Sequence, residues 1–176
     1  MSLLNTIVPQ FAVKAYHAGA FEDVNEKKLD GHWSVLFFYP ADFSAVCPTE
    51  LYDLQEHYAE FAKMGVEVYS VSTDSHYSHQ GWAESTPMID QIAYPMLADH
   101  AQALCVALGV LIAGAGVAER ATFILDPERR IKAIEISDGP VARKADELVR
   151  KVKAAQFVAA TGKIAPATWA VPQAQA

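Results

Sequence analysis

One of the two cysteines, Cys47, lies in a stretch whose residue types suit thiol chemistry. The stretch is PADFSAVCPTE, residues 40–50. Pro40 precedes the cysteine by seven residues, where it fixes the backbone direction and helps to keep water from the sulfur. Ser44 lies three residues before the cysteine, close enough for its hydroxyl to form a hydrogen bond near the sulfur or to orient an oxygen substrate. This combination indicates a nucleophilic thiolate rather than a cysteine that only fills space.

The position of Cys47 in the predicted secondary structure supports the same chemistry. An apolar run at 33–39 predicts a buried strand, and a helical pattern follows to about residue 64. A sulfur in the first turn of a helix faces unpaired backbone N–H groups and the positive end of the helix dipole. Both favour the thiolate over the thiol. Pro48 suits a first turn, and a carboxylate there, Glu50, favours the dipole and can orient a nearby base.

A cationic partner for the sulfur is also expected. A helix terminus supplies only ~1–2 kcal/mol to a charge beside it, which is too little to keep a cysteine ionised at neutral pH. Arg120, which opens a predicted strand in ERATFILDP, is the best candidate. Arg143 is the second candidate.

The elements that must hold these residues follow one another as strands and helices. Residues 1–30 predict a small β-hairpin at the edge of the domain, with turns at Gly19 and Asp30-Gly31. Strands are predicted at 33–39, 66–73, 94–97, 121–125 and 131–136, and helices from the Cys47 junction to about 64 and at 76–84, 101–108 and 141–160. The Gly- and Ala-rich residues 109–118 predict a loop. This order predicts an α/β fold in which a central mixed sheet has helices on both faces.

Composition sets limits on the class of protein. At 176 residues and 52% hydrophobic content, the chain suits a single domain spanning 1–176, with a Pro- and Ala-rich tail at about 162–176. A net charge of −7 argues against nucleic acid as a partner. The first residues lack the layout of a signal peptide, and no apolar run is long enough to span a membrane. We therefore expect a cytoplasmic protein without a membrane partner.

The stretch around Cys47 resembles the P-x-x-x-(T/S)-x-x-C active-site motif of the peroxiredoxins. The segments VYSVSTDSH, RATFILDP and VRKVKAAQ resemble the subgroup of typical 2-Cys peroxiredoxins that contains the alkyl hydroperoxide reductase C subunit. The resemblance extends to Trp169. It implies a thioredoxin-like fold and an antioxidant peroxidase that reduces hydrogen peroxide and small alkyl hydroperoxides through a sulfenic acid at Cys47.

The resemblance also implies roles for the neighbouring residues. Pro40 would shield the sulfur, Ser44 would bind thiolate and peroxide, and Arg120 would stabilise the developing charge. Glu50 would orient the arginines, and Arg143 matches a further arginine of the family. The resemblance implies no metal and no organic cofactor. The implied partners are a peroxide, an external thiol or disulfide reductase as electron donor, and further copies of the chain, as a homodimer that assembles to a decamer.

The chain departs from this family where a second cysteine is usual. Members of the subgroup carry a resolving cysteine in a V-C-P-A-x-W context, and the equivalent here is IAPATW, 164–169, with Ala165 in the place of the cysteine. Ala165 is either a natural variant or an introduced one. Cys105 is the only other thiol, and its apolar neighbours predict a packing role, with a substitute resolving role as the alternative.

The sequence has features that bear on functions other than a peroxidase. A ring-forming chaperone or redox relay with weak turnover is the alternative that the missing resolving cysteine favours. A disulfide reductase is disfavoured because Ser44 occupies the first position of what would be a C-x-x-C motif. His76 and His79 lack further ligands at metal-binding spacing, so we expect surface or hydrogen-bonded histidines near a subunit interface. Trp82 and Trp169 are expected to pack in the core or at an interface.

Overall fold

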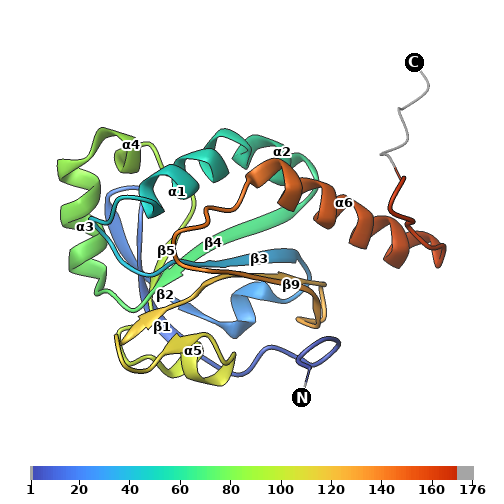
Figure 1. Ribbon diagram of the computed structural model, residues 1–176, viewed down its shortest axis with the longest axis horizontal. Coiled ribbons are helices and arrows are strands. Elements are labelled where there is room, and N and C mark those ends of the chain that lie inside the picture. The colour runs from blue at the N-terminus through green and yellow to red at the C-terminus, as the bar shows by residue number, and fades with distance from the viewer. Residues whose placement is uncertain (1, 170–176) are drawn as a thin grey trace.

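The centre of the computed structural model, which describes residues 2–169, is a seven-stranded sheet in the order β2-β1-β5-β4-β3-β8-β9 (Figure 1). The strands β3, β4 and β5 run parallel, while β1, β2, β8 and β9 pair antiparallel with their neighbours. The mixed sheet predicted from the sequence is therefore confirmed. The strands of this sheet are β1 Ala12–His17, β2 Ala20–Asn25, β3 Trp33–Phe38, β4 Val66–Ser72, β5 Met96–Ala98, β8 Arg120–Leu125 and β9 Ile131–Ser137.

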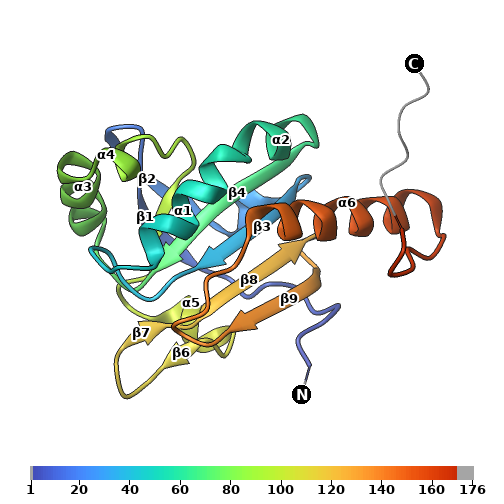
Figure 2. The same cartoon turned by 45° about the horizontal axis from the view of Figure 1, so that its top comes forward.

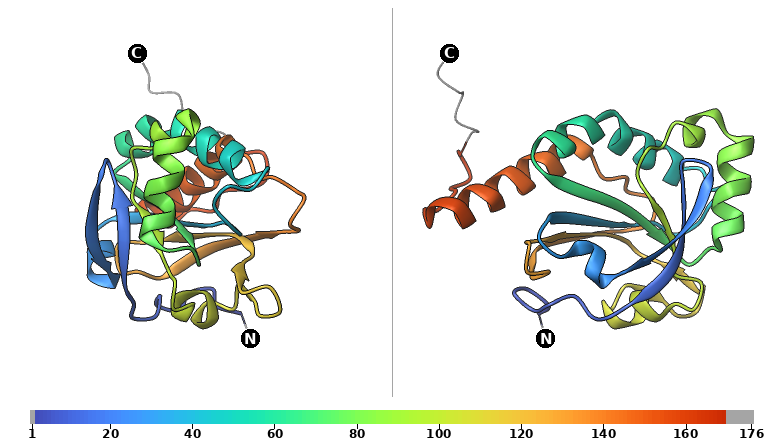
Figure 3. Two further views of the ribbon diagram at one scale, coloured as in Figure 1. Left: turned by 90° about the vertical axis from the view of Figure 1, so that its left-hand side faces the viewer. Right: turned by 180° about the vertical axis from the view of Figure 1, so that it is seen from behind.

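Helices cover both faces of the sheet. Helices α1, α2, α3, α4 and α6 lie on one face, and α5 lies with the N-terminal segment on the other (Figures 1 and 3). The helices are η1 Glu26–Leu29, α1 Cys47–Glu56, α2 Tyr58–Lys63, α3 His76–Ser85, α4 Pro87–Asp90, α5 Ala103–Ala107 and α6 Ala145–Thr161. This arrangement confirms the predicted thioredoxin-like α/β fold.

The central strand β3 shows why its sequence is apolar throughout. Val35 and Phe37 pack into the core beneath α1 and α6, whereas Leu36 and Phe38 pack into the core on the α5 side. Successive side chains of a strand point to opposite faces, so a strand covered on both faces has no polar side. The strand ends directly before the stretch that contains Cys47.

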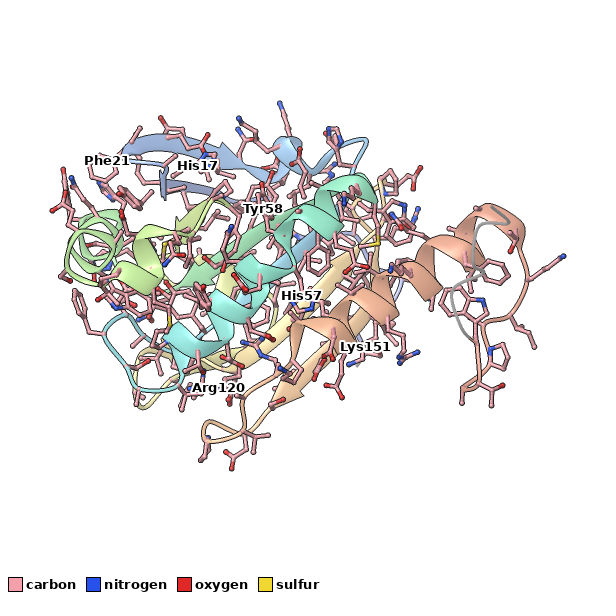
Figure 4. The ribbon with its side chains drawn as sticks, turned by 90° about the horizontal axis from the view of Figure 1, so that it is seen from above. His17, Phe21, His57, Tyr58, Arg120 and Lys151 are labelled. Carbon is pink, nitrogen blue, oxygen red and sulfur yellow. The ribbon has the colours of Figure 1, made fainter. Side chains whose placement is uncertain are left out.

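The predicted N-terminal hairpin is confirmed as the edge pair β1–β2. Its turn consists of Ala18 and Gly19, both with positive φ, at 49° and 84°. Two consecutive left-handed residues form the type of tight turn that matches the twist of a hairpin. The hairpin, with His17 and Phe21, lies at the opposite side of the sheet from α6 and Lys151 (Figure 4).

The prediction of a single long helix after Cys47 is wrong, because the structure has two helices there, α1 and α2. His57 separates the two, and its Nδ1 binds the carbonyl oxygen of Asp53 at 2.9 Å. That carbonyl would otherwise accept the backbone N–H of His57. Leu51, Leu54 and Phe61 still face the core on both sides of the break.

The predicted loop at 109–118 is also only partly right. Leu111–Ile112 (β6) and Val117–Ala118 (β7) form a small antiparallel hairpin next to the sheet (Figure 2). The turn closes through the N–H groups of Ala115 and Gly116, which both donate to the Ile112 carbonyl. Gly116 has φ of 70°, which favours glycine at this point of the turn.

Helix α6 begins at Ala145, four residues later than predicted, and ends at Thr161 before the left-handed Gly162. The start is late because residues 141–144 form an extended connection that carries Arg143 into the core. The far half of α6 projects beyond the sheet (Figures 2 and 3). Val158, in this far half of the helix, is consequently 42% exposed.

Beyond α6 the chain turns back, and the Trp169 ring packs on Phe157 with 5.3 Å between ring centroids. This confirms a packing role for Trp169. The rest of the predicted tail, 170–176, lies outside the described residues. Within residues 2–169, no helix combines the length and apolar character needed to cross a bilayer.

Candidate active site

Cys47 is the first residue of α1 and is completely buried. Pro48 follows it in the first turn, where its missing N–H costs no helical hydrogen bond. The strand-to-helix junction predicted from the sequence is therefore present. Its consequence is that the sulfur lies at the N-terminal end of a helix, within a protein environment that excludes water.

Arg120 provides the cationic partner. Its Nη1 donates a hydrogen bond to the Cys47 Sγ at 3.3 Å, and its Nε donates to the Gly139 carbonyl at 2.5 Å. In Figure 4, Arg120 lies beside the first turn of α1. Burial lowers the pKa of the Arg120 guanidinium, but the sulfur and the Glu50 carboxylate outweigh burial and raise it. The guanidinium is therefore a permanent positive charge directed at the sulfur.

Glu50 joins Arg120 to the second arginine, Arg143. Its Oε2 accepts hydrogen bonds from Arg120 Nη1 at 2.6 Å and from Arg143 Nη2 at 3.2 Å. Its Oε1 accepts from the backbone N–H and the Nε of Arg143 at 2.8 and 3.0 Å. A buried carboxylate with four charge-assisted or backbone donors is held in one position. Glu50 therefore contacts both of the arginines that it is predicted to orient.

Arg143, the second candidate for the cationic partner, makes no hydrogen bond to the sulfur among the contacts of the described residues. Its guanidinium donates to the Thr122 hydroxyl and the Phe38 carbonyl, at 2.9 and 2.8 Å, and its Cζ lies 3.6 Å from the centre of the Phe37 ring. Burial lowers the pKa of Arg143, an effect that Glu50 partly offsets. Arg143 therefore anchors the carboxylate, while Arg120 contacts the sulfur.

Three buried charged groups lie together beside Cys47. Arg120, Arg143 and Glu50 carry one net positive charge between them. Uncompensated buried charge is costly. The arrangement is therefore suited to hold an anionic group next to the sulfur.

Pro40 and Ser44 lie in the loop between β3 and α1, and both are partly buried. The Ser44 hydroxyl donates to the carbonyl of Ala41 at 2.9 Å rather than to the sulfur. The predicted hydrogen bond between Ser44 and the thiolate is thus not made here, because the loop itself satisfies the hydroxyl. The oxygen keeps its lone pairs for another donor.

A buried polar group that the sequence analysis missed supports this loop. Asp42 accepts a hydrogen bond from the Tyr39 hydroxyl at 2.8 Å, and its Oδ2 lies 2.9 Å from the Nδ1 of His79. His79 is completely buried, so of its two expected roles the hydrogen-bonded one is confirmed. Its spacing from Trp82 and Ala83, which face the core, is the sequence signal for a buried histidine. Trp82 itself packs against Tyr39 and confirms its predicted packing role.

Cys105 is buried in the core on the other face of the sheet, in agreement with a packing role. Burial, together with the Asp99 carboxylate, raises the pKa of its thiol. Ala165 lies in the chain after α6 and is partly buried, near Ala155 and Lys151. Within the part of the chain that the structure describes, no three His, Cys, Asp or Glu side chains are grouped to bind a metal ion.

Comparison with known proteins agrees with this geometry. Residues 4–134 match the model of the AhpC/TSA family. Over 170 residues the chain is 48% identical to alkyl hydroperoxide reductase C of Salmonella typhimurium and 50% identical to that of Bacillus subtilis, covering 96% of this chain and 91% of each relative.

Two solved structures extend the comparison to the fold. Enterococcus faecalis AhpC superposes with a TM-score of 0.92 at 52% identity, covering 94% of this chain and all of that one. A reduced 2-Cys peroxiredoxin of Plasmodium vivax superposes with a TM-score of 0.94 at 26% identity, covering 99% and 92%. The chain therefore belongs to the AhpC/TSA family, within its alkyl hydroperoxide reductase C subgroup.

Proposed function

We propose that this protein is a thiol-dependent peroxidase in which the Cys47 thiolate reduces hydrogen peroxide and small alkyl hydroperoxides. The observation that carries the proposal is the Arg120 Nη1 at 3.3 Å from the sulfur, within a buried group of charged residues that carries a net positive charge. The relatives are named as reductases and peroxiredoxins, which favours a peroxidase over the chaperone or redox-relay alternative.

In the first step the thiolate attacks one oxygen of the peroxide. A sulfur–oxygen bond forms and the O–O bond breaks, and the leaving group, an alkoxide or, with hydrogen peroxide, a hydroxide, takes a proton from solvent to become the alcohol or water. Cys47 becomes a sulfenic acid. Charge moves from sulfur to oxygen during this step, so the Arg120 guanidinium stabilises the transition state without reorganising. Pro40 limits water at the sulfur, and the Ser44 oxygen accepts a hydrogen bond from the peroxide O–H.

The second half of the cycle requires a thiol from outside the chain. We propose that Ala165 occupies the resolving position, so that the usual intersubunit disulfide with Cys47 does not form. One external thiol condenses with the sulfenic acid and releases water. A second thiol, or a disulfide reductase, then regenerates Cys47 and leaves as the oxidised donor.

Exposed surfaces support the proposed homodimer and its assembly to a decamer. On its outer side β9 pairs with residues 5–6 at Ile131, and beyond Ile131 it has no strand partner among residues 2–169; Ile136 on this stretch is 55% exposed. An open edge strand is a template for pairing with another chain. Far from this edge, Phe21 packs on Tyr77, which is 67% exposed. Sedimentation velocity of the reduced and oxidised protein measures the assembly.

Cytoplasmic location and a single domain over 1–176 belong to the same proposal. One sheet carries Arg120 on β8 and, at the end of β3, the loop to Cys47, so both halves of the site depend on one core. Limited proteolysis tests the single domain, because the fragments of one cooperative core should be degraded together and none should persist as a separate stable piece.

The experiment that tests the proposed function is stopped-flow mixing of the reduced protein with hydrogen peroxide. The change in tryptophan fluorescence should be rapid and should disappear in Cys47→Ser. A slow reaction in the parent protein, or an unchanged one in the variant, contradicts the proposal. Reduction of insulin by the dithiothreitol-recycled protein would instead identify a disulfide reductase.

A further inference from the structure

The N-terminus of α6 is capped by a side chain from another helix. Lys144, the residue before the helix, makes no side-chain cap of its own. Instead Asp53 of α1 accepts the backbone N–H of Ala145 through Oδ2 at 2.7 Å, and its Oδ1 lies 3.4 Å from the Lys144 Nζ. The first N–H groups of a helix need such acceptors, which normally come from the residue at the helix start.

Asp53 lies one turn beyond Glu50 on α1. Cys47, Glu50 and Asp53 are spaced by three residues, so each is the neighbour of the next on the helix surface, while Asp53 is about 120° around the helix from Cys47. Residues 143–145, which we call the strap, run beside Glu50 and Asp53. Glu50 accepts the N–H of Arg143 at 2.8 Å, and Asp53 accepts the N–H of Ala145 at 2.7 Å. Two carboxylates of α1 therefore hold the strap at two points.

We propose that Asp53 is a positioning residue for the attack of Cys47 on peroxide. It fixes the strap at Ala145, two residues beyond Arg143. Arg143 in turn holds the Glu50 carboxylate, which holds Arg120 Nη1 at 2.6 Å. That same nitrogen donates to the sulfur.

A small displacement along this chain of contacts moves the donor that must meet the developing charge. Misplacement of a reacting group by about 1 Å costs up to about 10²-fold in rate. The free energy that one helix cap contributes corresponds to roughly a fivefold change in an equilibrium or rate constant. We therefore expect Asp53→Ala to slow the attack on peroxide at least about fivefold.

The inference rests on Cys47 as the attacking residue, so two reactions of Cys47 must be compared. Attack on peroxide needs the thiolate and a correctly placed Arg120. Alkylation by iodoacetamide needs the thiolate and access but develops no charge on oxygen. The ratio of the two rate constants therefore reports the position of Arg120, whereas a general loss of structure affects both reactions. No reaction of the parent with peroxide would refute the proposed function, and an unchanged ratio in the variants would refute this inference alone.

Four variants make the test sharp. Asp53→Ala should lower the ratio at least about fivefold, and Asp53→Asn, which keeps an accepting oxygen, should retain most of it. Ala145→Pro removes the donor instead, at a helix position that accepts proline and after an extended Lys144 (φ −110°, ψ 134°). It should lower the ratio as Asp53→Ala does. Asp146→Ala is the matched control, since this exposed carboxylate in the same turn bonds only the N–H of Glu147.

A parent-like ratio in Asp53→Ala overturns the inference, as does an equal loss in Asp53→Asn. If Asp53→Ala does not fold, a parent-like ratio in Ala145→Pro overturns it instead. In the double variant Asp53→Ala/Ala145→Pro the two losses should not add, because both substitutions remove the same hydrogen bond, from the Ala145 N–H to Asp53.

Discussion

Replacing Arg120 by alanine should slow the reaction of Cys47 with peroxide by about two orders of magnitude. The Nη1 atom donates to the sulfur at 3.3 Å in a buried site. A hydrogen bond to a charged group is worth roughly 1.5–3 kcal/mol, which corresponds to roughly 10–150-fold in rate. The substitution also removes the positive charge that faces the sulfur, so the negative charge that moves during the attack loses its stabilising partner.

Stopped-flow fluorescence measures this effect, because the Trp82 ring lies 5.9 Å from that of Phe43 in the loop before Cys47. Arg120→Lys keeps the charge but not the paired donors, so its rate should fall between those of the parent and Arg120→Ala. Arg150→Ala, an exposed position on α6, is the control for loss of a positive charge. A rate constant for Arg120→Ala within about threefold of the parent would show that the guanidinium does not assist the attack.

Three further predictions concern the rest of the chain. Because burial raises the pKa of the Cys105 thiol, Cys105 in the native Cys47→Ser protein should not react with a thiol reagent at pH 8 and should react fully in guanidinium. Cys105→Ser should turn over peroxide with an external thiol as the parent does, and a loss of turnover would identify Cys105 as a resolving residue. His79→Ala removes a buried hydrogen-bond partner of Asp42 and should lower the free energy of unfolding in urea by roughly 1–3 kcal/mol, against about 0–1 kcal/mol for the exposed Lys14→Ala, and equal losses would contradict the role of burial. Excess peroxide should convert Cys47 to the sulfinic acid, seen as added oxygen by mass spectrometry, and Ala165→Cys should reduce this product by forming a disulfide.

The elements that carry the site were predictable because their signals are local. The apolar run of β3 and the prolines around Cys47 need no distant information. Cys47 and Glu50 share a helical face by spacing alone.

What the sequence did not predict depends on contacts between distant segments. The late start of α6 follows from the insertion of Arg143 against Glu50, which lies 93 residues earlier. The capping of α6 by Asp53 could not be read from Lys144, which has no capping side chain. The break at His57 coincides with a hydrogen bond from its own side chain to the Asp53 carbonyl, and the periodicity of the apolar residues continues through it. Ser44 bonds within its own loop, which its distance from Cys47 along the chain does not indicate.

The net charge of the buried group around Cys47 changes during the reaction cycle. The resting group of two arginines, one carboxylate and one thiolate is neutral, but a sulfenic acid carries no charge, so oxidation leaves the buried group with one net positive charge. An electron donor that approaches as a thiolate is attracted to this oxidised site and is not attracted to the resting one. The same arginines that promote attack on peroxide therefore also give the oxidised protein a preference for anionic reductants, and the preference should weaken as ionic strength rises.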